Sequence, residues 1–356
     1  MQSIRDLTLK QRVKLFWTWF TLHGTELERL IDATRQEFAA IMIAEQLQKL
    51  NLPSLCEVDR TNDGYVLSLS PCGNKTHQFV TRFWAQSAPI VEKWQFNAFR
   101  KPSKQAAEEL IRIAGKEWDP EQFAVYCAPD DEVQKYRVCV VSAAFQPQTK
   151  AERQMLARMI FYLFLGEAYT ELYIGEVDCT DTEPKTPISD KRLSLAEFCE
   201  VIRRTPLERP WNCVNDPTTL CFGYQGTESH SDAMREDILG GFSRHMPLLA
   251  TPYTEAEALL EMGGVFCYLY YAPVGNDPRK QAEERATLTM RVEQLLDSLQ
   301  LGYVLGGAQG TDFSYIDLMI FDEPAFRAVF RDAELLFEVP MNMEYFGRTE
   351  SGEYIQ

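Results

Sequence analysis

The sequence contains no long apolar run, and this absence excludes one class of protein at once. No stretch approaches the roughly 18 consecutive apolar residues that a membrane-spanning helix needs. The first twenty residues also lack the continuous apolar core and the small-residue cleavage site of a secretory signal. We therefore expect a cytoplasmic protein that is not inserted in a membrane.

Cysteine is present, but not in the spacings that mark metal or disulfide sites. The nine cysteines are an odd number, no pair has CxxC spacing, and several lie in apolar runs such as Val138-Cys139-Val140. A cysteine in such a run behaves as a small hydrophobic residue. We predict reduced thiols, no bound metal and no cofactor.

The common catalytic motifs are missing as well. GxSxG, HExxH and Walker patterns do not occur. The glycine-rich stretch 306–310 has no lysine and precedes a strand, so hairpin glycines explain it better than a phosphate-binding loop. His230, Asp232 and His245 offer the residue types of a general base and its partner. A hydrolase site at these three residues is the alternative to a binding function, although surface histidines are the simpler interpretation.

Basic residues are scarce relative to acidic ones. The 356 residues include 36 Lys and Arg against 52 Asp and Glu, a formal net charge of −16, and residues 187–356 hold 27 acidic and 14 basic side chains. This excess argues against nonspecific binding to nucleic acid or to anionic membranes, which carry phosphate. It favours a basic protein partner, or it serves solubility alone.

The length predicts two or three domains.

The N-terminal half shows a repeated order of expected elements. A capping box at Thr25 and Glu28 predicts a helix running to about Leu50. The elements that follow are strands 55–58 and 65–69, a helix over 75–88, a strand at 94–99, a helix at 104–115, strands 123–127 and 136–142, a helix at 151–165 and a strand at 172–177. Residues 25–100 and 103–178 thus each give helix-strand-strand-helix-strand. We predict a duplicated α/β unit in an N-terminal domain covering residues 1–178.

The rest of the chain is predicted to be a linker, a connecting region and a second domain. Residues 179–192 are polar and unperiodic, which is typical of a linker, and residues 193–262 form the connecting region. Residues 263–356 give the order βαββαβ, which predicts a ferredoxin-like two-layer sandwich. The fold class is therefore α/β in the broad sense, that is α+β.

The C-terminal domain supplies a candidate surface for a partner. One face of a ferredoxin-like sheet is expected to be open, and exposed apolar patches usually mark an interface. The aromatic and methionine residues that alternate on the strands, together with nearby acids, form this set: Tyr268, Tyr270, Asp312, Tyr315, Asp317, Met319 and Glu323. We therefore favour a protein-binding or regulatory role over an enzymatic one. An inhibitor-like role would use the acidity to occupy a site that normally takes phosphate.

Four phrases of the sequence carry a resemblance to known proteins. They are Phe16-Trp17-Thr18-Trp19-Phe20, Ala88-Pro89 with Trp94 and Ala98-Phe99-Arg100, Arg291-Val292-Glu293 with Leu295-Leu296, and Gly302 to Gly307 with Tyr315-Ile316-Asp317. Together they resemble an uncharacterised family of bacterial cytoplasmic proteins, common in gut Bacteroidetes, with an N-terminal domain of unknown function. The resemblance implies no activity. In element order and charge, the C-terminal part is similar to the B-type acidic inhibitors of ribonuclease E.

Overall fold

The protein consists of two compact units. Unit 1 contains residues 1–54, 87–89 and 221–356, and unit 2 contains residues 55–86 and 90–220. The computed structural model describes residues 3–103, 111–113, 116–146, 148–211, 214–226, 235–275, 277–337 and 339–347. Among these residues, no helix has the length and apolar character that spanning a membrane requires.

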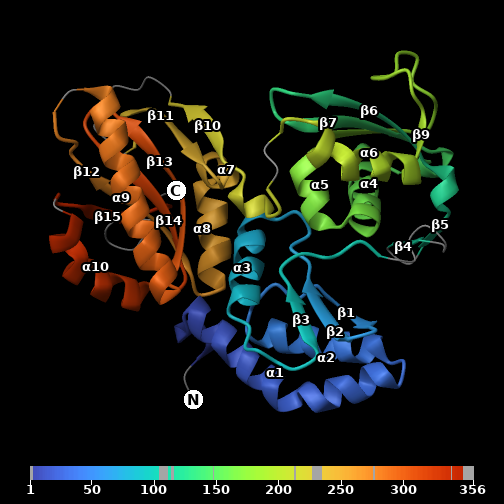
Figure 1. The fold of residues 1–356 in the computed structure, drawn as a ribbon, viewed down its shortest axis with the longest axis horizontal. Helices are drawn as coiled ribbons and strands as arrows, with labels where there is room; N and C mark the ends of the chain where they lie inside the picture. Colours follow the sequence, from blue (N-terminus) through green and yellow to red (C-terminus); the bar gives the residue numbers. More distant parts are fainter. Residues whose placement is uncertain are drawn as a thin grey trace. The chain divides into compact units, whose positions relative to one another are not determined.

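Unit 1 combines N-terminal helices with a six-stranded sheet. Its helices are η1 (Ile4–Asp6), α1 (Leu9–Asp32), α2 (Gln36–Lys49), α7 (Met246–Ala250), α8 (Pro252–Glu261), α9 (Pro278–Leu299) and α10 (Glu323–Phe337). Its strands are β10 (Phe222–Gln225), β11 (Ile238–Ser243), β12 (Val265–Tyr271), β13 (Gly302–Gly310), β14 (Ser314–Ile320) and β15 (Asn342–Tyr345). The strands lie in the order β10-β11-β13-β14-β12-β15 (Figure 1).

The C-terminal part of unit 1 has the predicted ferredoxin-like topology. Its elements follow the order β12-α9-β13-β14-α10-β15, and the strands lie side by side as β13-β14-β12-β15, each antiparallel to its neighbours. The βαββαβ prediction is therefore confirmed over the described residues. Strands β11 and β10 extend the sheet beyond β13.

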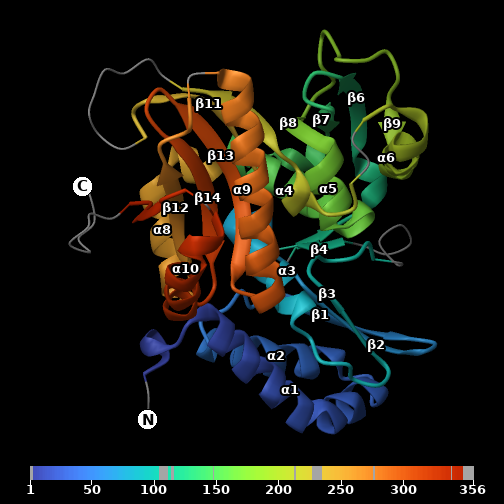
Figure 2. The same ribbon diagram turned by 60° about the vertical axis from the view of Figure 1, so that its left-hand side comes forward.

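Apolar side chains of α9 and α10 cover one face of this sheet. Leu288, Val292 and Leu296 lie about one turn apart on α9 and belong to the same buried cluster as Ile316 and Leu318 of β14. Figure 2 shows α9 lying along the sheet. Strand β14 is buried along its whole length, which is typical of a central strand packed on both faces.

Helix α1 begins earlier than the sequence predicted. Thr8 caps its first turn in a capping box with Gln11, and the helix runs on through Thr25 and Glu28, where a helix start was expected. The predicted single helix is also broken near Thr34, which has a φ of 57°, and α2 follows this break. The expected helix start was wrong because a capping pattern of residue types also fits the interior of a helix.

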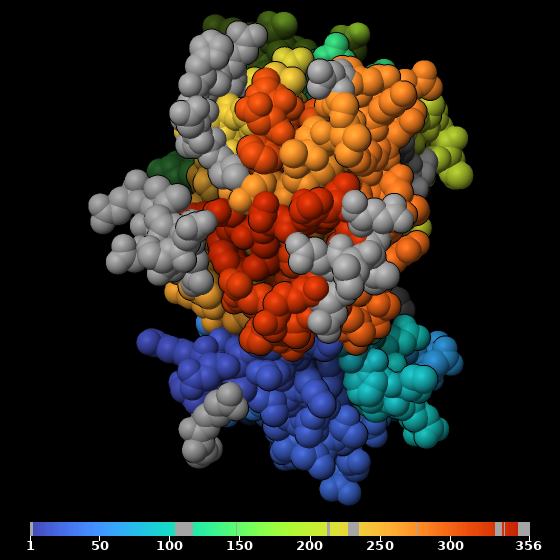
Figure 3. Space-filling view, turned by 90° about the vertical axis from the view of Figure 1, so that its left-hand side faces the viewer, coloured from blue at the N-terminus to red at the C-terminus, as the bar shows by residue number. Residues whose placement is uncertain are grey.

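The N-terminal helices belong with the C-terminal half of the chain. Arg12 of α1 is buried, and its guanidinium donates to the carbonyl of Glu261 at 2.6 Å. The Asn51 amide donates to the same carbonyl at 2.6 Å. In Figure 3 the blue N-terminal segment borders the red C-terminal elements. The boundary therefore differs from the predicted 1–178 domain, since residues 1–54 form part of unit 1.

Unit 2 holds three sheets among its described residues. Its helices are α3 (Lys75–Gln86), η2 (Pro120–Gln122), η3 (Ala143–Phe145), α4 (Lys150–Leu165), α5 (Glu167–Tyr173), α6 (Leu195–Glu208) and η4 (Pro217–Thr219). Its strands are β1 (Cys56–Thr61), β2 (Gly64–Leu69), β3 (Trp94–Asn97), β4 (Ile111–Ile113), β5 (Lys116–Trp118), β6 (Ala124–Asp130), β7 (Lys135–Val141), β8 (Ile174–Thr180) and β9 (Leu193–Ser194). The sheets have the orders β1-β2-β3, β4-β5 and β8-β7-β6-β9.

The two larger sheets of unit 2 repeat one topology. Strands β1 and β2 form an antiparallel hairpin, and α3 leads to β3, which is parallel to β2. Strands β6 and β7 form a second hairpin, and α4 and α5 lead to β8, which is parallel to β7. The strand-strand-helix-strand part of the predicted duplication is thus present twice. The helix expected at 104–115 lies mostly outside the described residues, and 111–113 form strand β4 instead.

The predicted linker 179–192 lies within unit 2. Strand β8 ends at Thr180 and β9 begins at Leu193, and both strands belong to one sheet. The segment between them is largely exposed, and its Glu183 accepts a hydrogen bond from the Tyr126 hydroxyl at 2.8 Å. The predicted connecting region 193–262 is divided between the two units at residue 220.

Candidate functional site

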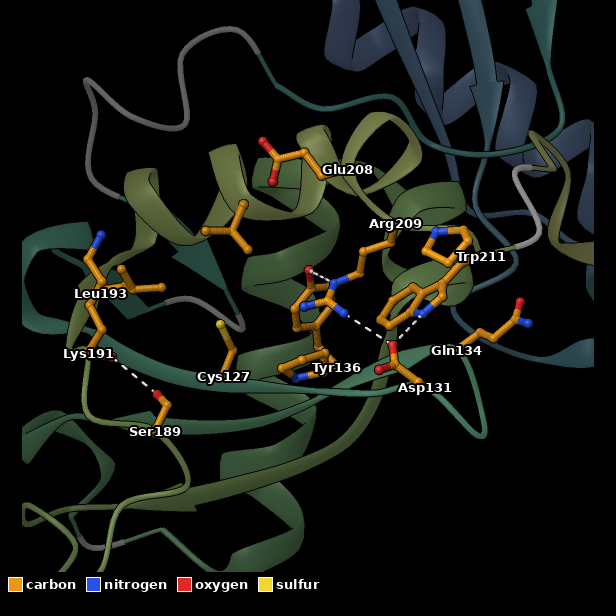
Figure 4. A pocket seen from close by; sticks show the side chains of 13 residues that line it. Cys127, Asp131, Gln134, Tyr136, Ser189, Lys191, Leu193, Glu208, Arg209 and Trp211 are labelled. Carbon is orange, nitrogen blue, oxygen red and sulfur yellow. Dashed lines mark hydrogen bonds and ion pairs between the residues drawn. The ribbon is translucent and has the colours of Figure 1, made fainter.

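A cleft of about 740 Å³ opens in unit 2 beside the C-terminal end of α6. Its walls come from the β6–β7 hairpin, from β9 and the segment before it, and from α6 and the residues that follow it (Figure 4). This volume lies within the roughly 300–1,000 Å³ that is usual for ligand sites. All lining residues belong to unit 2.

The end of α6 positions two of the cleft residues. Pro210 has no amide hydrogen and cannot continue a helix. Arg209, the C-cap, is extended, with φ −121° and ψ 144°, and its N–H donates to the Thr205 carbonyl at 3.0 Å. In an extended chain, side chains two residues apart point to the same side. Arg209 and Trp211 therefore face the hairpin together.

Arg209 is held by one carboxylate and two aromatic rings. Its Nη1 lies 3.1 Å from Asp131 Oδ1, and its Nε donates to the Tyr136 hydroxyl at 3.1 Å. Trp211 Nε1 donates to the same Asp131 oxygen at 2.8 Å (Figure 4). The guanidinium carbon lies 5.5 Å from the Tyr136 ring centroid and 5.1 Å from that of Trp211, both within cation–π distance. The planar cation is thus fixed before any ligand binds.

The charge on Arg209 is secure, whereas the nearby thiol is neutral. Burial disfavours the Arg209 cation, but the Tyr136 hydrogen bond and the Asp131 charge outweigh it and raise the pKa of Arg209. Burial raises the pKa of the Cys127 thiol, although Lys191 and Arg209 work in the opposite direction. Because the thiolate is the nucleophilic form of cysteine, a protonated Cys127 contributes apolar surface to the cleft.

An apolar floor lies between the cationic ends of the cleft. Cys127, Leu193 and Val201 line it, and Leu193 is buried while the other two are half-buried. Lys191 is exposed at one end of this floor, and Arg209 lies at the other end (Figure 4). A ligand therefore meets two positive groups separated by an apolar strip.

The two carboxylates of the cleft differ in their availability. Asp131 already accepts hydrogen bonds from Arg209 and Trp211 through one oxygen. Glu208 is exposed, and in Figure 4 its carboxylate lies away from Arg209. Asp131 nevertheless remains 72% exposed, so the cleft presents Lys191 and Arg209 beside two carboxylates.

The residues predicted to form an open face on the C-terminal sheet lie inside unit 1. Tyr315 and Met319 are fully buried, and only 5% of Tyr268 is exposed. Asp317 is 1% exposed and pairs with Arg235, whose Nη1 lies 2.5 Å from Asp317 Oδ1. The prediction of an open face was wrong for these four residues, because both faces of the central strands are covered.

Arg235 explains how Asp317 is accommodated in the interior. The guanidinium carbon of Arg235 lies 4.9, 5.2 and 4.7 Å from the ring centroids of Tyr268, Tyr315 and Phe346. Burial disfavours the Arg235 cation, but the Asp317 charge and hydrogen bond prevail and raise the pKa of Arg235. A paired and enclosed charge of this kind serves the structure of the unit.

The other predicted surface residues are less buried. Tyr270 is half-buried, and its ring contacts the Phe313 ring edge-on at 5.4 Å between centroids. Glu323 accepts a hydrogen bond from Arg327 at 2.9 Å and another from the Tyr345 hydroxyl. Asp312 is exposed. Of the three acids, Asp312 is thus the most exposed, Glu323 is partly exposed and Asp317 is buried.

The alternative hydrolase site is represented in the described residues by His245 alone, because His230 and Asp232 lie outside them. His245 is fully buried and is the N-cap of α7, where its Nδ1 accepts from the Leu248 N–H at 3.1 Å. Its Nε2 lies 3.7 Å from a Glu255 carboxylate oxygen. These contacts give His245 a structural role.

One local pattern in the sequence points to the cleft. Arg209-Pro210-Trp211 directly follows the periodic part of a helix, and a proline there forces an extended chain that presents both neighbours on one side. This local pattern does not reveal the partners of Arg209 on the hairpin, because Tyr136 is 73 residues away in the sequence.

Comparisons with known proteins add no further identification. Neither protein-family models nor curated proteins nor solved structures give a match for this chain. The described cysteines are free thiols, and among the described residues no group of three or more His, Cys, Asp or Glu is arranged to hold a metal ion. The geometry of the cleft is therefore what indicates a function.

Proposed function

We propose that the protein is a cytoplasmic protein-binding module and that the cleft of unit 2 takes an extended segment of a partner polypeptide. The observation that supports this proposal is the fixed Arg209 guanidinium at one end of the apolar floor. Arginine and aromatic side chains in a desolvated pocket are typical of interface hot spots. A side chain that is already ordered also loses less conformational freedom on binding.

The chemistry of the cleft specifies the segment that it would recognise. An apolar side chain fits the floor formed by Cys127, Leu193 and Val201. Carboxylates on either side of that residue would meet Lys191 and Arg209. Charge-assisted hydrogen bonds between a guanidinium and a carboxylate are among the strongest in proteins. We therefore expect an acidic-apolar-acidic segment.

A peptide titration tests this proposal. The probes are fluorescein-labelled octapeptides that contain two aspartates. One, two or three residues separate the aspartates, and one of these residues is leucine. Binding is measured by fluorescence polarisation. Replacing both aspartates by asparagine, or the leucine by serine, should weaken binding at least about tenfold. Equal binding of all these peptides would contradict the proposed recognition.

Matched variants of the protein complete this test. Lys191→Gln and Arg209→Gln should each lower the affinity for the best peptide at least about fivefold. Lys185→Gln serves as the control, because Lys185 is exposed on the same loop and does not line the cleft. If the control variant weakens binding as much as the other two, the cleft is not the binding site.

A second candidate partner is a basic protein attracted to unit 1. Residues 221–356 hold 22 acidic and nine basic side chains, and Asp312 remains exposed among them. Long-range attraction of this kind weakens as salt rises. Binding of an acidic peptide should weaken less as salt rises, because salt screens both its contacts with the two cations and its repulsion from a protein of net charge −16. The salt dependence of a partner's affinity therefore distinguishes the two candidates.

A further inference from the structure

A second cavity of unit 2, of about 500 Å³, lies apart from the cleft and has a different chemistry. It is bounded by residues 96–102, at the end of β3 and directly after it, by the junction of α4 and α5 at residues 165–169, and by α6 at Arg203. It shares no lining residue with the cleft. Its lining includes three cationic side chains and no carboxylate, which is unusual in a chain of net charge −16.

Aromatic rings form the apolar part of this cavity. Phe96, Phe99 and Tyr169 line it, and each is half-buried. The Phe96 ring is stacked on Trp94, with 6.2 Å between centroids and an angle of 5° between planes. Tyr169 contacts Tyr173 at 5.5 Å. These contacts hold the rings in place, so the cavity offers pre-ordered surfaces on which a planar group can stack.

The three cations lie on the same cavity but differ in how they are held. Arg203 donates to Glu200 at 2.7 Å and to the Phe164 carbonyl at 3.0 Å. Lys101 is exposed. Both terminal nitrogens of Arg203 are thus ordered by these hydrogen bonds. The Lys101 ammonium is accessible to a ligand.

Arg100, the second cation of the cavity, is held by two carboxylates. Its guanidinium pairs with Glu57 through Nη2, and its N–H donates to the buried Glu167 carboxylate at 3.0 Å. The Nε of Arg100 is buried and has no hydrogen-bond partner among the described residues. The guanidinium is thus held by Glu57, and its positive charge lies beside the cavity that Arg100 lines.

The main chain at the mouth of the cavity is also fixed. Gly166 has a φ of 80°, and a Cβ at this position would lie 2.9 Å from Pro102 Cδ and 3.1 Å from the Arg100 carbonyl oxygen. The Glu167 N–H donates to that carbonyl at 3.1 Å. The segment that carries Arg100 and Lys101 is therefore packed directly against the start of α5, with room only for glycine.

We propose that this cavity binds a small aromatic anion, a ligand in which a planar ring carries a phosphate or carboxylate. The ring would stack among Phe96, Phe99 and Tyr169, and the anionic group would face Lys101 and the two arginines. Nucleoside monophosphates and simple aromatic acids share this chemistry. The site does not depend on peptide binding in the cleft, because the two cavities have separate linings.

Four probes titrated into the full-length protein by calorimetry test this inference. Phenyl phosphate and adenosine 5′-monophosphate carry both a ring and an anion, adenosine lacks the anion, and inorganic phosphate lacks the ring. Both ring-bearing phosphates should bind at least about tenfold more tightly than adenosine and inorganic phosphate. Tighter binding of the nucleotide than of phenyl phosphate would identify the nucleobase as the preferred ring. Inorganic phosphate binding as tightly as phenyl phosphate, or no binding of any probe at millimolar concentration, would overturn the inference.

Variants locate the binding in this cavity. Lys101→Gln and Arg203→Gln should each lower the affinity for phenyl phosphate about fivefold or more, and both side chains are exposed enough for the fold to tolerate the change. Phe99→Leu should lower it about threefold through loss of stacking. Lys191→Gln, in the separate cleft, is the matched control and should leave the affinity unchanged. Equal affinity of the Lys101, Arg203 and control variants would place the ligand elsewhere.

Discussion

Arg209 and Trp211 donate hydrogen bonds to the same oxygen of Asp131, at 3.1 and 2.8 Å. Pro210 lies between the two donors and keeps the chain extended after α6. The shared acceptor couples the end of a helix to a hairpin that is remote in sequence. This relationship fixes the cation on which the proposed peptide site depends.

The planar guanidinium of Arg209 should contribute more to peptide affinity than its positive charge alone. Arg209→Lys keeps the positive charge but loses the stacking between rings and the paired hydrogen bonds. We expect this variant to bind the acidic octapeptide at least about fivefold more weakly in fluorescence polarisation. Lys191→Arg is the matched change at an exposed side chain and should alter affinity less than about twofold. Wild-type affinity in Arg209→Lys would show that the fixed geometry is irrelevant to binding.

Breaking the buried ion pair of unit 1 should lower the free energy of unfolding more than breaking an exposed pair. Asp317→Asn leaves the enclosed Arg235 cation without its counter-charge, and breaking a buried pair in this way costs about 3–5 kcal/mol. The free energy of unfolding in urea measures this loss. Replacing both residues, as Arg235→Met with Asp317→Leu, should cost less than the single change.

An exposed pair on α9 provides the control for that measurement. Arg279 and Glu283 lie 3.3 Å apart, and both side chains are mostly exposed. Glu283→Gln should change the free energy of unfolding by less than about 1 kcal/mol. Similar losses in Asp317→Asn and Glu283→Gln would contradict the interior position of the Arg235–Asp317 pair.

Glu167 should make the stability of the protein depend on pH. Its carboxylate is fully buried and accepts hydrogen bonds from the Ser70 hydroxyl at 2.6 Å and from the main-chain N–H groups of Cys72 and Arg100, each at 3.0 Å. Burial nevertheless raises its pKa above the ordinary value of 4.5. A raised pKa means that folding favours the protonated form, so the contribution of Glu167 is greatest below pH 4.5 and falls as pH rises through the native pKa.

Comparison with Glu167→Gln isolates this effect. The variant does not titrate at this position, so the stability of the wild type relative to it should decline as pH rises above 4.5 and then level off. Urea unfolding at a series of pH values between 4 and 8 provides the measurement. Glu176→Gln, at an exposed position of β8, should stay within roughly 0.5 kcal/mol of the wild type throughout. A stability difference between wild type and Glu167→Gln that rises with pH would contradict the assignment.

The loop between β8 and β9 should be the site of earliest proteolysis. Lys185, Lys191 and Arg192 are all exposed on it. Trypsin should therefore cut native protein first within residues 181–192, because exposed loops are preferred sites of cleavage. Saturating acidic octapeptide should protect Lys191, which lines the cleft, but not Lys185. Mass spectrometry of the first fragments identifies the cut, and equal protection at both lysines would argue against binding in the cleft.

The C-terminal topology could be predicted because its elements are strongly patterned. Val265–Tyr271 and Ser314–Ile320 are nearly continuous apolar runs, and both are buried strands. The N-terminal helix was harder to delimit, because the residue types at Thr25 and Glu28 fit a capping box that the chain does not use. Sequence alternation also indicated which residues share a face of the sheet, but not that other elements cover that face.

The cleft could not be predicted for a different reason. Asp131 and Tyr136 are separated from Arg209 by more than 70 residues, and no local pattern links a hairpin to the end of a remote helix. The same limitation applies to Asp317, which looked like a surface acid in the sequence. Its partner Arg235 is 82 residues away and is preceded by a segment without periodic pattern.

Hydrogen–deuterium exchange with and without the acidic octapeptide identifies the residues that bind the peptide. Exchange of main-chain amides reports local opening, and a ligand slows it where it binds. If the cleft of unit 2 is the recognition site, protection will be confined to the β6–β7 hairpin, the residues around Lys191 and the end of α6 up to Trp211. Protection confined to residues 221–347 of unit 1 would contradict binding in the cleft. Exchange rates that do not change when saturating peptide is added would contradict it as well.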